Sequence, residues 1–249
     1  MTKQIQITYP IQILPTINNP VLSRTCRKWP FISKVLDRLP SRILRKIYSD
    51  DYSVNERIIE HPFVHANLAG VSPGARILDV GSNYSPLVLE LAGLGFNVTA
   101  LDINESAFQH PNITFATGSI CNTAFDNEAF DVVTAISTVE HIGLGYYGDS
   151  TAEASDIKAV REIRRILKAS GKLILTVPYG VRSTTKFTRI YDRDLLNQLL
   201  DGFEKLSELY AIRTNSRCWM RSSEEEASIR KVEGFEHIRA VVCLALKKV

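Results

Sequence analysis

Cysteine is scarce in this sequence, and no two cysteines lie close together. The 249 residues include only four, without a C-x-x-C pair, which argues against a zinc site and against a disulfide framework. We therefore expect reduced thiols, mostly in the core. They are Cys26, Cys121, Cys218 and Cys243.

Long hydrophobic runs are also missing. No apolar run approaches the roughly 18–20 residues that a membrane-spanning helix needs, and residues 1–20 lack the charged, apolar and small-residue order of a secretory signal. A composition of 45% hydrophobic and 23% charged residues is ordinary for a globular protein. The sequence predicts a cytoplasmic protein without transmembrane helices, built around one large domain.

A net charge of +3 conceals a strongly basic segment. Residues 21–49 hold eight basic side chains and one acid, Asp37, so the rest of the chain is net acidic. We therefore expect no nucleic-acid partner. Apolar residues recur at helical spacing in the same segment, which predicts a helical N-terminal extension over residues 1–70. Its apolar stripe packs on the following domain in one interpretation. In the other, residues 21–49 make a peripheral contact with anionic lipid or a membrane-bound partner.

From residue 71 to 249 the pattern becomes that of a single α/β domain. Buried β-type runs alternate with amphipathic segments at 85–94 and 153–168, and Ser150 with Glu153 resembles a capping box for the second helix. We predict a Rossmann-like, doubly wound, mostly parallel seven-stranded sheet with helices on both faces. The strand candidates are RILDVG, NVTALDI, ITFATGS, FDVVTAIS, KLILTVPYG, KLSELYAI and AVVCLAL.

A nucleotide-binding turn follows the first of these strands. Asp79 ends the strand, Gly81 allows a tight turn, and a helix begins soon after. Asp102 ends the next strand, 23 residues after Asp79, where an acid can accept both hydroxyls of a ribose. The turn lacks G-x-G-x-x-G, and Asp79 would repel a pyrophosphate. The methionine end of S-adenosylmethionine (SAM), which carries an ammonium, suits such an acid better.

These residues resemble the class I SAM-dependent methyltransferases over residues 75–249. The resemblance implies that the turn cradles the amino-acid part of SAM, that Asp102 binds the ribose, and that residues after the third strand hold the adenine. Asn83 stands where the family usually has a second glycine, and Ser119 stands where it often has an acid. The cofactor-binding candidates are Asp79, Gly81, Ser82, Asn83, Asp102, Ile103, Ser119 and Ile120.

A closer resemblance lies in residues 137–149, which contain EHIGLGYYGD. This block is similar to one in a little-characterised methyltransferase-like family, some of whose members are found with glycan and polysaccharide genes. His141 is the candidate general base for a substrate hydroxyl, and Glu140 orients it or acts in its place. The alternative is that the pair only shapes the SAM pocket. We expect the glycine-rich segment to close over the substrate.

The resemblance makes a small-molecule or glycan acceptor, with a sugar hydroxyl as the methylated group, the leading hypothesis. Arg182, Lys186 and Arg189 are candidates for recognising an anionic group on it. Four tyrosines offer flat surfaces for stacking. They are Tyr146, Tyr147, Tyr179 and Tyr191.

Other functions stay open at this stage. A small-molecule or lipid-like N- or O-methyltransferase, an NAD-dependent oxidoreductase and a catalytically silent SAM-binding protein are each compatible with part of the pattern. A magnesium site at His141, Asp149 and Asp156 is a further alternative, although no tight acidic cluster is present and we expect no metal.

Overall fold

The computed structural model describes residues 17–18, 53–83, 85–105, 110–232 and 238–249. The basic segment 21–49, with its expected helices and its membrane contact, lies outside the described residues. The described part of the N-terminal region comprises β1 (Ile17–Asn18), which pairs with β2 (Ser53–Val54), and α4 (Arg57–Asn67). In the described residues, no helix is long and apolar enough to cross a membrane.

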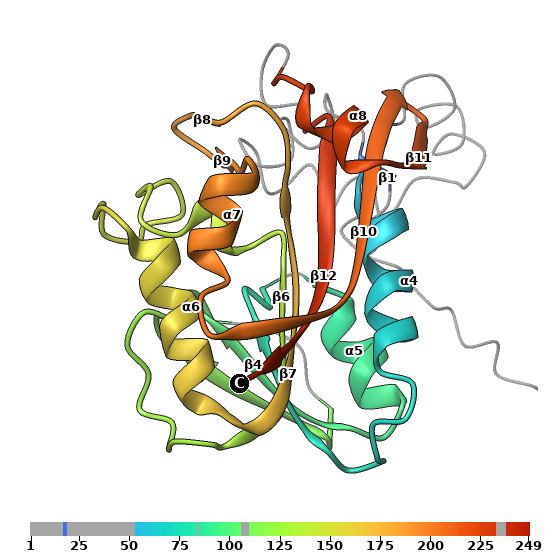
Figure 1. Ribbon diagram of the computed structural model, residues 1–249. Coiled ribbons are helices and arrows are strands. Elements are labelled where there is room, and N and C mark those ends of the chain that lie inside the picture. Colours follow the sequence, from blue (N-terminus) through green and yellow to red (C-terminus); the bar gives the residue numbers. More distant parts are fainter. Residues whose placement is uncertain (1–16, 19–52, 84, 106–109, 233–237) are drawn as a thin grey trace, which may run out of the picture.

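One central sheet organises the domain, in the order β11-β10-β12-β7-β6-β3-β4-β5 (Figure 1). The neighbours from β7 to β5 pair in parallel, whereas β12 is antiparallel to both β7 and β10. The strands are β3 (Arg76–Val80), β4 (Asn97–Asp102), β5 (Ile113–Thr117), β6 (Phe130–Ile136), β7 (Leu167–Pro178), β10 (Phe203–Asn215), β11 (Cys218–Ser222) and β12 (Ala240–Lys248).

The mostly parallel α/β fold is therefore confirmed, but the expected number of seven strands is wrong, because the described residues form eight strands of this sheet. The additional strand is β11, which folds back on β10 as an antiparallel hairpin and pairs Tyr210 with Ser222. Its sequence, CWMRS, is short, and none of its five residues is buried, so it lacks the apolar run that marked the other strands.

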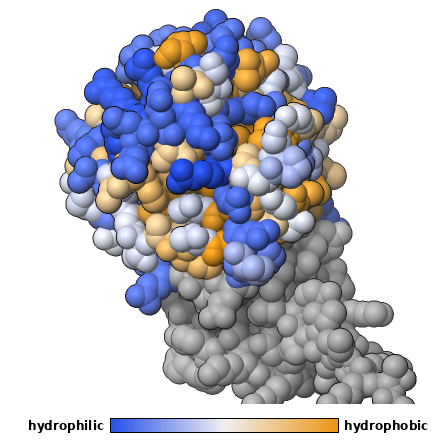
Figure 2. Space-filling model, turned by 90° about the horizontal axis from the view of Figure 1, so that it is seen from below, coloured by the Kyte–Doolittle hydropathy of each residue, from blue (hydrophilic) through white to orange (hydrophobic). Residues whose placement is uncertain are grey.

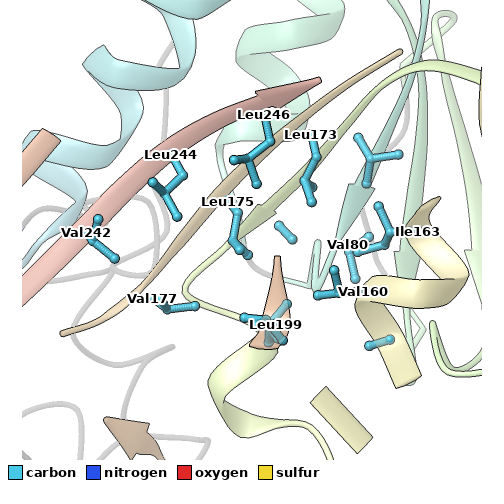
Figure 3. Close-up of a cluster of buried hydrophobic side chains, with 14 of the residues drawn as sticks. Val80, Val160, Ile163, Leu173, Leu175, Val177, Leu199, Val242, Leu244 and Leu246 are labelled. Carbon is cyan, nitrogen blue, oxygen red and sulfur yellow. The ribbon is translucent and has the colours of Figure 1, made fainter. Parts of the chain in front are cut away.

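Helices cover both faces of the sheet (Figure 1). One face carries α6 (Ser155–Ile166) and α7 (Arg193–Leu199), and the other carries α4 and α5 (Leu87–Gly93). Buried side chains form two hydrophobic cores, one on each face of the sheet. Figure 3 shows part of the first core, on the α6 face, which includes Leu175 of β7, Leu244 of β12 and Ile163 of α6. Such full burial stabilises the fold by about 1.5–3 kcal/mol for each large aliphatic side chain.

Helix α4 belongs to the second core, although it falls within the segment expected as an extension. Phe63 and Val64 are buried against the sheet, where they join Leu91 of α5 and Val241 of β12. The apolar face of α4 therefore packs on the central sheet as part of the domain's core.

The expected capping box is wrong. Helix α6 begins at Ser155, after Ala154 in the left-handed region at φ 53°, and no side chain caps it. The cause is the preceding loop, in which the Ala152 N–H donates to the Gly143 carbonyl at 3.2 Å. That bond holds residues 150–154 in the loop, so the helix starts later than the residue pattern suggests.

Figure 2 shows the molecule from below the view of Figure 1. Hydrophilic residues cover much of this face, and apolar residues are scattered among them. The described cavity lies elsewhere, at the carboxyl ends of the parallel strands.

Candidate functional site

A cavity of about 550 Å³ lies across the carboxyl ends of β3, β4, β5 and β6. Open parallel sheets place their ligands at this edge, and the volume is ordinary for a small-molecule site. Seven of the ten predicted site residues line it. They are Gly81, Asn83, Asp102, Ile103, Ser119, Ile120 and His141.

Gly81 forms the turn at the end of β3. It takes φ +76°, and a Cβ at this position would overlap the side chain of Thr138. The Gly81 N–H donates to the Leu101 carbonyl at 2.8 Å, which draws the turn towards β4. Both the backbone conformation and the close approach require glycine here.

Asp102 ends β4 on the wall of the cavity. One carboxylate oxygen accepts the Asn83 N–H at 3.0 Å, and the other accepts the Asn104 N–H at 2.8 Å. A carboxylate offers about four acceptor positions. Asp102 therefore keeps capacity for a ligand's hydroxyl groups while its orientation is fixed from both sides.

Asp79 and Ser82 do not line the cavity, contrary to expectation. Asp79 is 2% exposed and accepts the Thr134 hydroxyl at 2.5 Å, so it lies beneath the turn. Burial raises the pKa of its carboxyl to about 7. The Ser82 hydroxyl is buried and has no hydrogen-bond partner in the described part of the chain.

Ser119 and Ile120 follow β5 at the far end of the cavity. The Ser119 hydroxyl accepts the Cys121 N–H at 3.2 Å, which leaves its own hydrogen available to a ligand. Ile120 is buried and offers an apolar surface beside it. This end of the cavity combines a polar edge with an apolar wall.

His141 lies on the cavity wall in a defined tautomer. Its Nδ1 lies 2.5 Å from the Phe187 carbonyl oxygen, which can only accept, so Nδ1 carries the proton. Burial and, to a smaller extent, the nearby cations Arg57 and Arg189 together lower the pKa of His141 to about 4. The imidazole is therefore neutral near pH 7, and its Nε2 lone pair can accept a proton.

Glu140 lies behind His141 and is fully buried. One of its oxygens is 3.6 Å from His141 Nε2, and neither oxygen has a hydrogen-bond partner among the described residues. Burial raises the pKa of Glu140 well above its ordinary value. Because Glu140 is not part of the cavity wall, its contact with the site passes through His141.

The glycine-rich block forms a compact loop. The Gly143 N–H donates to Asp149 Oδ2 at 2.5 Å, and Arg189 donates to the Ile142 carbonyl at 2.6 Å. Arg189 also lies 3.9 Å from buried Asp156. Arg189 therefore holds the loop instead of facing a substrate. Arg182 pairs with Asp192 at 2.7 Å, and neither arginine lines the cavity.

Aromatic rings surround His141 at the mouth of the cavity. The ring centres of Phe187 and Tyr147 lie 4.4 Å and 5.4 Å from that of His141. The ring of Tyr146 packs edge-on against those of Phe187 and Tyr147, with centres 4.8 Å and 5.1 Å apart. Tyr146 and Tyr147 are each 47% exposed. The other two candidate tyrosines, Tyr179 and Tyr191, are buried in the core and are not available for stacking.

Arg57 and Thr138 are among the wall residues that sequence reasoning missed. Arg57 comes from α4, which lies within the predicted N-terminal extension over residues 1–70, so no local pattern connects it with the turn at Gly81. Thr138 follows β6 and lies inside the 137–149 block, but nothing in that block marks it as a site residue. In the described ranges, no three His, Cys, Asp or Glu side chains are placed to hold a metal ion.

Comparison with known proteins gives a family model and methyltransferase relatives. The model described as "Caenorhabditis protein of unknown function, DUF268" matches residues 97–248. Sterol 24-C-methyltransferase ERG6B of Gibberella zeae is 30% identical over 159 residues, which are 59% of this chain and 37% of that protein. The chain thus spans well under half of that relative's length.

Solved structures agree on the fold. A SAM-dependent methyltransferase from Methanosarcina mazei superposes with a TM-score of 0.54 at 15% identity, covering 76% of this chain and 97% of that one. The 1,6-didemethyltoxoflavin-N1-methyltransferase of Burkholderia thailandensis, with bound 1,6-didemethyltoxoflavin and S-adenosylhomocysteine, gives a TM-score of 0.54 at 14% identity and covers 93% of this chain and 91% of that one. The class I methyltransferase fold is confirmed.

Proposed function

The chain belongs to the DUF268 family, and we propose that it is a SAM-dependent methyltransferase that methylates a hydroxyl group of a sugar or glycan precursor. The observation that carries the proposal is one cavity that joins the Gly81 turn, Asp102 and Ser119 at the ends of three neighbouring strands. The methyltransferase relatives and the shared fold support SAM-dependent methyl transfer in general.

Successive parts of the cavity wall suit the amino-acid part, the ribose and the adenine of SAM. The Gly81 turn, which is tight because a Cβ there would collide with Thr138, lines the part of the cavity that suits the amino-acid part of SAM. Asp102, with acceptor capacity to spare, suits the two ribose hydroxyls. Ser119 and Ile120 provide a polar edge and an apolar wall for the adenine.

Bound SAM would supply an activated methyl group for direct in-line displacement. The protein's own part is to orient the acceptor and take its proton. His141 is placed for that role on the cavity wall, because the Phe187 carbonyl accepts its Nδ1–H and the Nε2 lone pair is left as the proton acceptor. Glu140 is a positioning residue in this proposal, since it meets His141 and not the cavity.

Two features at the mouth of the cavity support a sugar acceptor. Tyr147 presents a half-exposed ring beside His141, and aromatic faces stack on the apolar faces of sugars. Asp149 also lines the cavity, and its Oδ1 is buried without a hydrogen-bond partner among the described residues. A carboxylate oxygen in that position suits a hydroxyl donor.

Calorimetric titration with SAM, S-adenosylhomocysteine and NADH tests the cofactor. We expect saturable binding of the first two and none of NADH. A transfer assay with methyl-labelled SAM then compares nucleotide sugars and oligosaccharides with sterols and aromatic hydroxyl compounds. Label on sugars alone supports the acceptor class, and label on sterols or phenols overturns it. SAM binding without transfer to any of them would favour a silent SAM-binding protein.

A further inference from the structure

Arg57 is the one permanently cationic side chain on the described part of the cavity wall. The other ionisable groups there are His141, Tyr147 and three acids, Asp102, Glu105 and Asp149. The three carboxylates favour the cationic groups of a ligand. Any anionic group of that ligand needs a different partner.

Contacts through Glu60 show at which end of the cavity Arg57 lies. Arg57 pairs with Glu60, and Glu60 accepts the hydroxyls of Ser137 and Thr176 at 2.7 Å each. Ser137 directly follows β6 and is adjacent to Thr138, whose side chain covers Gly81. Arg57 therefore lies at the β3–β6 end of the cavity, and Ser119 lies at the β5 end.

Arg57 is held in place before any ligand arrives. Glu60 is fully buried, and the Arg57 side chain is 25% exposed. Glu56 lies 3.6 Å from the same guanidinium nitrogen. The neighbouring carboxylates raise the pKa of Arg57, so it stays charged. A guanidinium has five N–H donors, so contacts with Glu60 and Glu56 leave donors for a ligand.

We propose that Arg57 binds the α-carboxylate of the cofactor's methionine part. This inference rests on the proposed function, since it assumes that SAM occupies the cavity. SAM has two cationic groups, the sulfonium and the ammonium, and its carboxylate is its only anionic group. The carboxylate and the nucleoside lie at opposite ends of SAM, as Arg57 and Ser119 lie at opposite ends of the cavity. Arginine recognises carboxylates through parallel charge-assisted hydrogen bonds.

The proposal gives α4 a role in ligand binding. Arg57 is the first residue of this helix and precedes the residues that the family model matches, 97–248. Glu60 accepts hydrogen bonds from residues at the ends of β6 and β7 and pairs with Arg57, so it holds Arg57 in a defined position relative to the sheet. Arg57 is thus a cofactor-binding residue, and Glu60 is a positioning residue.

The test compares SAM with decarboxylated SAM, which lacks only the carboxylate. Calorimetry measures the Kd of both for the wild type, Arg57→Gln, Arg57→Lys and the exposed control Arg182→Gln. We expect Arg57→Gln to weaken SAM binding by about 10- to 100-fold, in keeping with loss of hydrogen bonds between charged groups. Binding of decarboxylated SAM should change less than about twofold. Arg57→Lys should give an intermediate loss for SAM, and Arg182→Gln none.

Each other outcome has a clear meaning. If Arg57→Gln weakens both ligands equally, or neither, the assignment of Arg57 is wrong and the proposed cofactor stands. If Arg57→Gln does not fold, Arg57→Lys decides in the same way, because it keeps a charge beside Glu60. If the wild type binds neither ligand, the proposed function itself fails and this inference fails with it.

Discussion

The side chain of Thr138 occupies the space in which a Cβ of residue 81 would stand. Thr138 is fixed there, because its hydroxyl lies 3.1 Å from both the Val80 and the Ile136 carbonyl oxygens and can donate to either. Gly81 follows β3 and Thr138 follows β6, two neighbouring parallel strands. The turn that forms the cavity floor is therefore determined by both strands together.

Gly81→Ala should abolish SAM binding. The added methyl group would overlap Thr138, and the alanine would have to adopt φ +76°, which L side chains rarely take. The turn therefore has to move. Gly95→Ala is the matched control, because Gly95 has φ +88° and nothing within 4 Å of the added Cβ. It should cost about 1–2 kcal/mol of stability and leave the Kd for SAM unchanged in calorimetry. Equal loss of binding in both variants would mean that backbone strain alone matters.

Asp102→Asn and Asp79→Asn should differ in their effect on SAM affinity. Asp102 lines the cavity, and Asp79 lies beneath it against Thr134. We expect Asp102→Asn to raise the Kd by about 10- to 100-fold through weaker hydrogen bonds to the ribose. Asp79→Asn keeps an acceptor for the Thr134 hydroxyl and should raise the Kd by less than about threefold. A larger loss in Asp79→Asn than in Asp102→Asn would restore Asp79 as the direct partner of the cofactor.

His141→Asn should separate catalysis from binding. The asparagine amide can still donate to the Phe187 carbonyl, as Nδ1 does, but nothing replaces Nε2. Loss of a general base lowers kcat by about 10²- to 10⁴-fold, and the Kd for SAM should stay within about twofold of the wild type. The measurement is kcat with the acceptor found in the transfer assay. Unchanged kcat would limit His141 to shaping the pocket.

The stability difference between the wild type and His141→Asn should depend on pH. Folding lowers the pKa of His141 from 6.5 to about 4, so between these values the unfolded chain binds the additional proton. This group therefore leaves stability unaffected above pH 6.5 and reduces it as the pH falls towards 4. By pH 4 the loss relative to the variant should reach on the order of 3 kcal/mol. Urea unfolding of both proteins at pH 7.5, 5.5 and 4.5 measures it, and a constant difference would contradict the lowered pKa.

Arg189→Met should destabilise the protein, whereas Arg182→Met should not. Arg189 is 12% exposed, donates to the Ile142 carbonyl and lies near buried Asp156. Its loss should cost about 2–3 kcal/mol, as for a hydrogen bond from a charged group. Arg182 forms an exposed pair with Asp192, worth about 0–1 kcal/mol. Thermal unfolding compares the two. If Arg189→Met changed the KM for the acceptor without lowering Tm, a substrate contact would be indicated instead.

The sequence by itself determined the features that depend on local pattern. Apolar β-type runs separated by amphipathic segments specify a mostly parallel sheet with helices on both faces, because only that arrangement buries them. Gly81 and Asp102 could be placed at the site because each directly follows a strand, and parallel strands end at one edge. The short strand β11, which has no apolar run, gave no such signal.

Only the tertiary structure decided which of these side chains face the cavity. Asp79 has the expected position in sequence, yet its side chain points towards Thr134 of the neighbouring strand and is buried. Arg57 belongs to a helix 24 residues before Gly81 in the sequence, and the wall acquires it because Phe63 and Val64 pack α4 on the sheet. Contacts between distant segments are set by packing and burial, which the spacing of residues along one strand or helix does not encode.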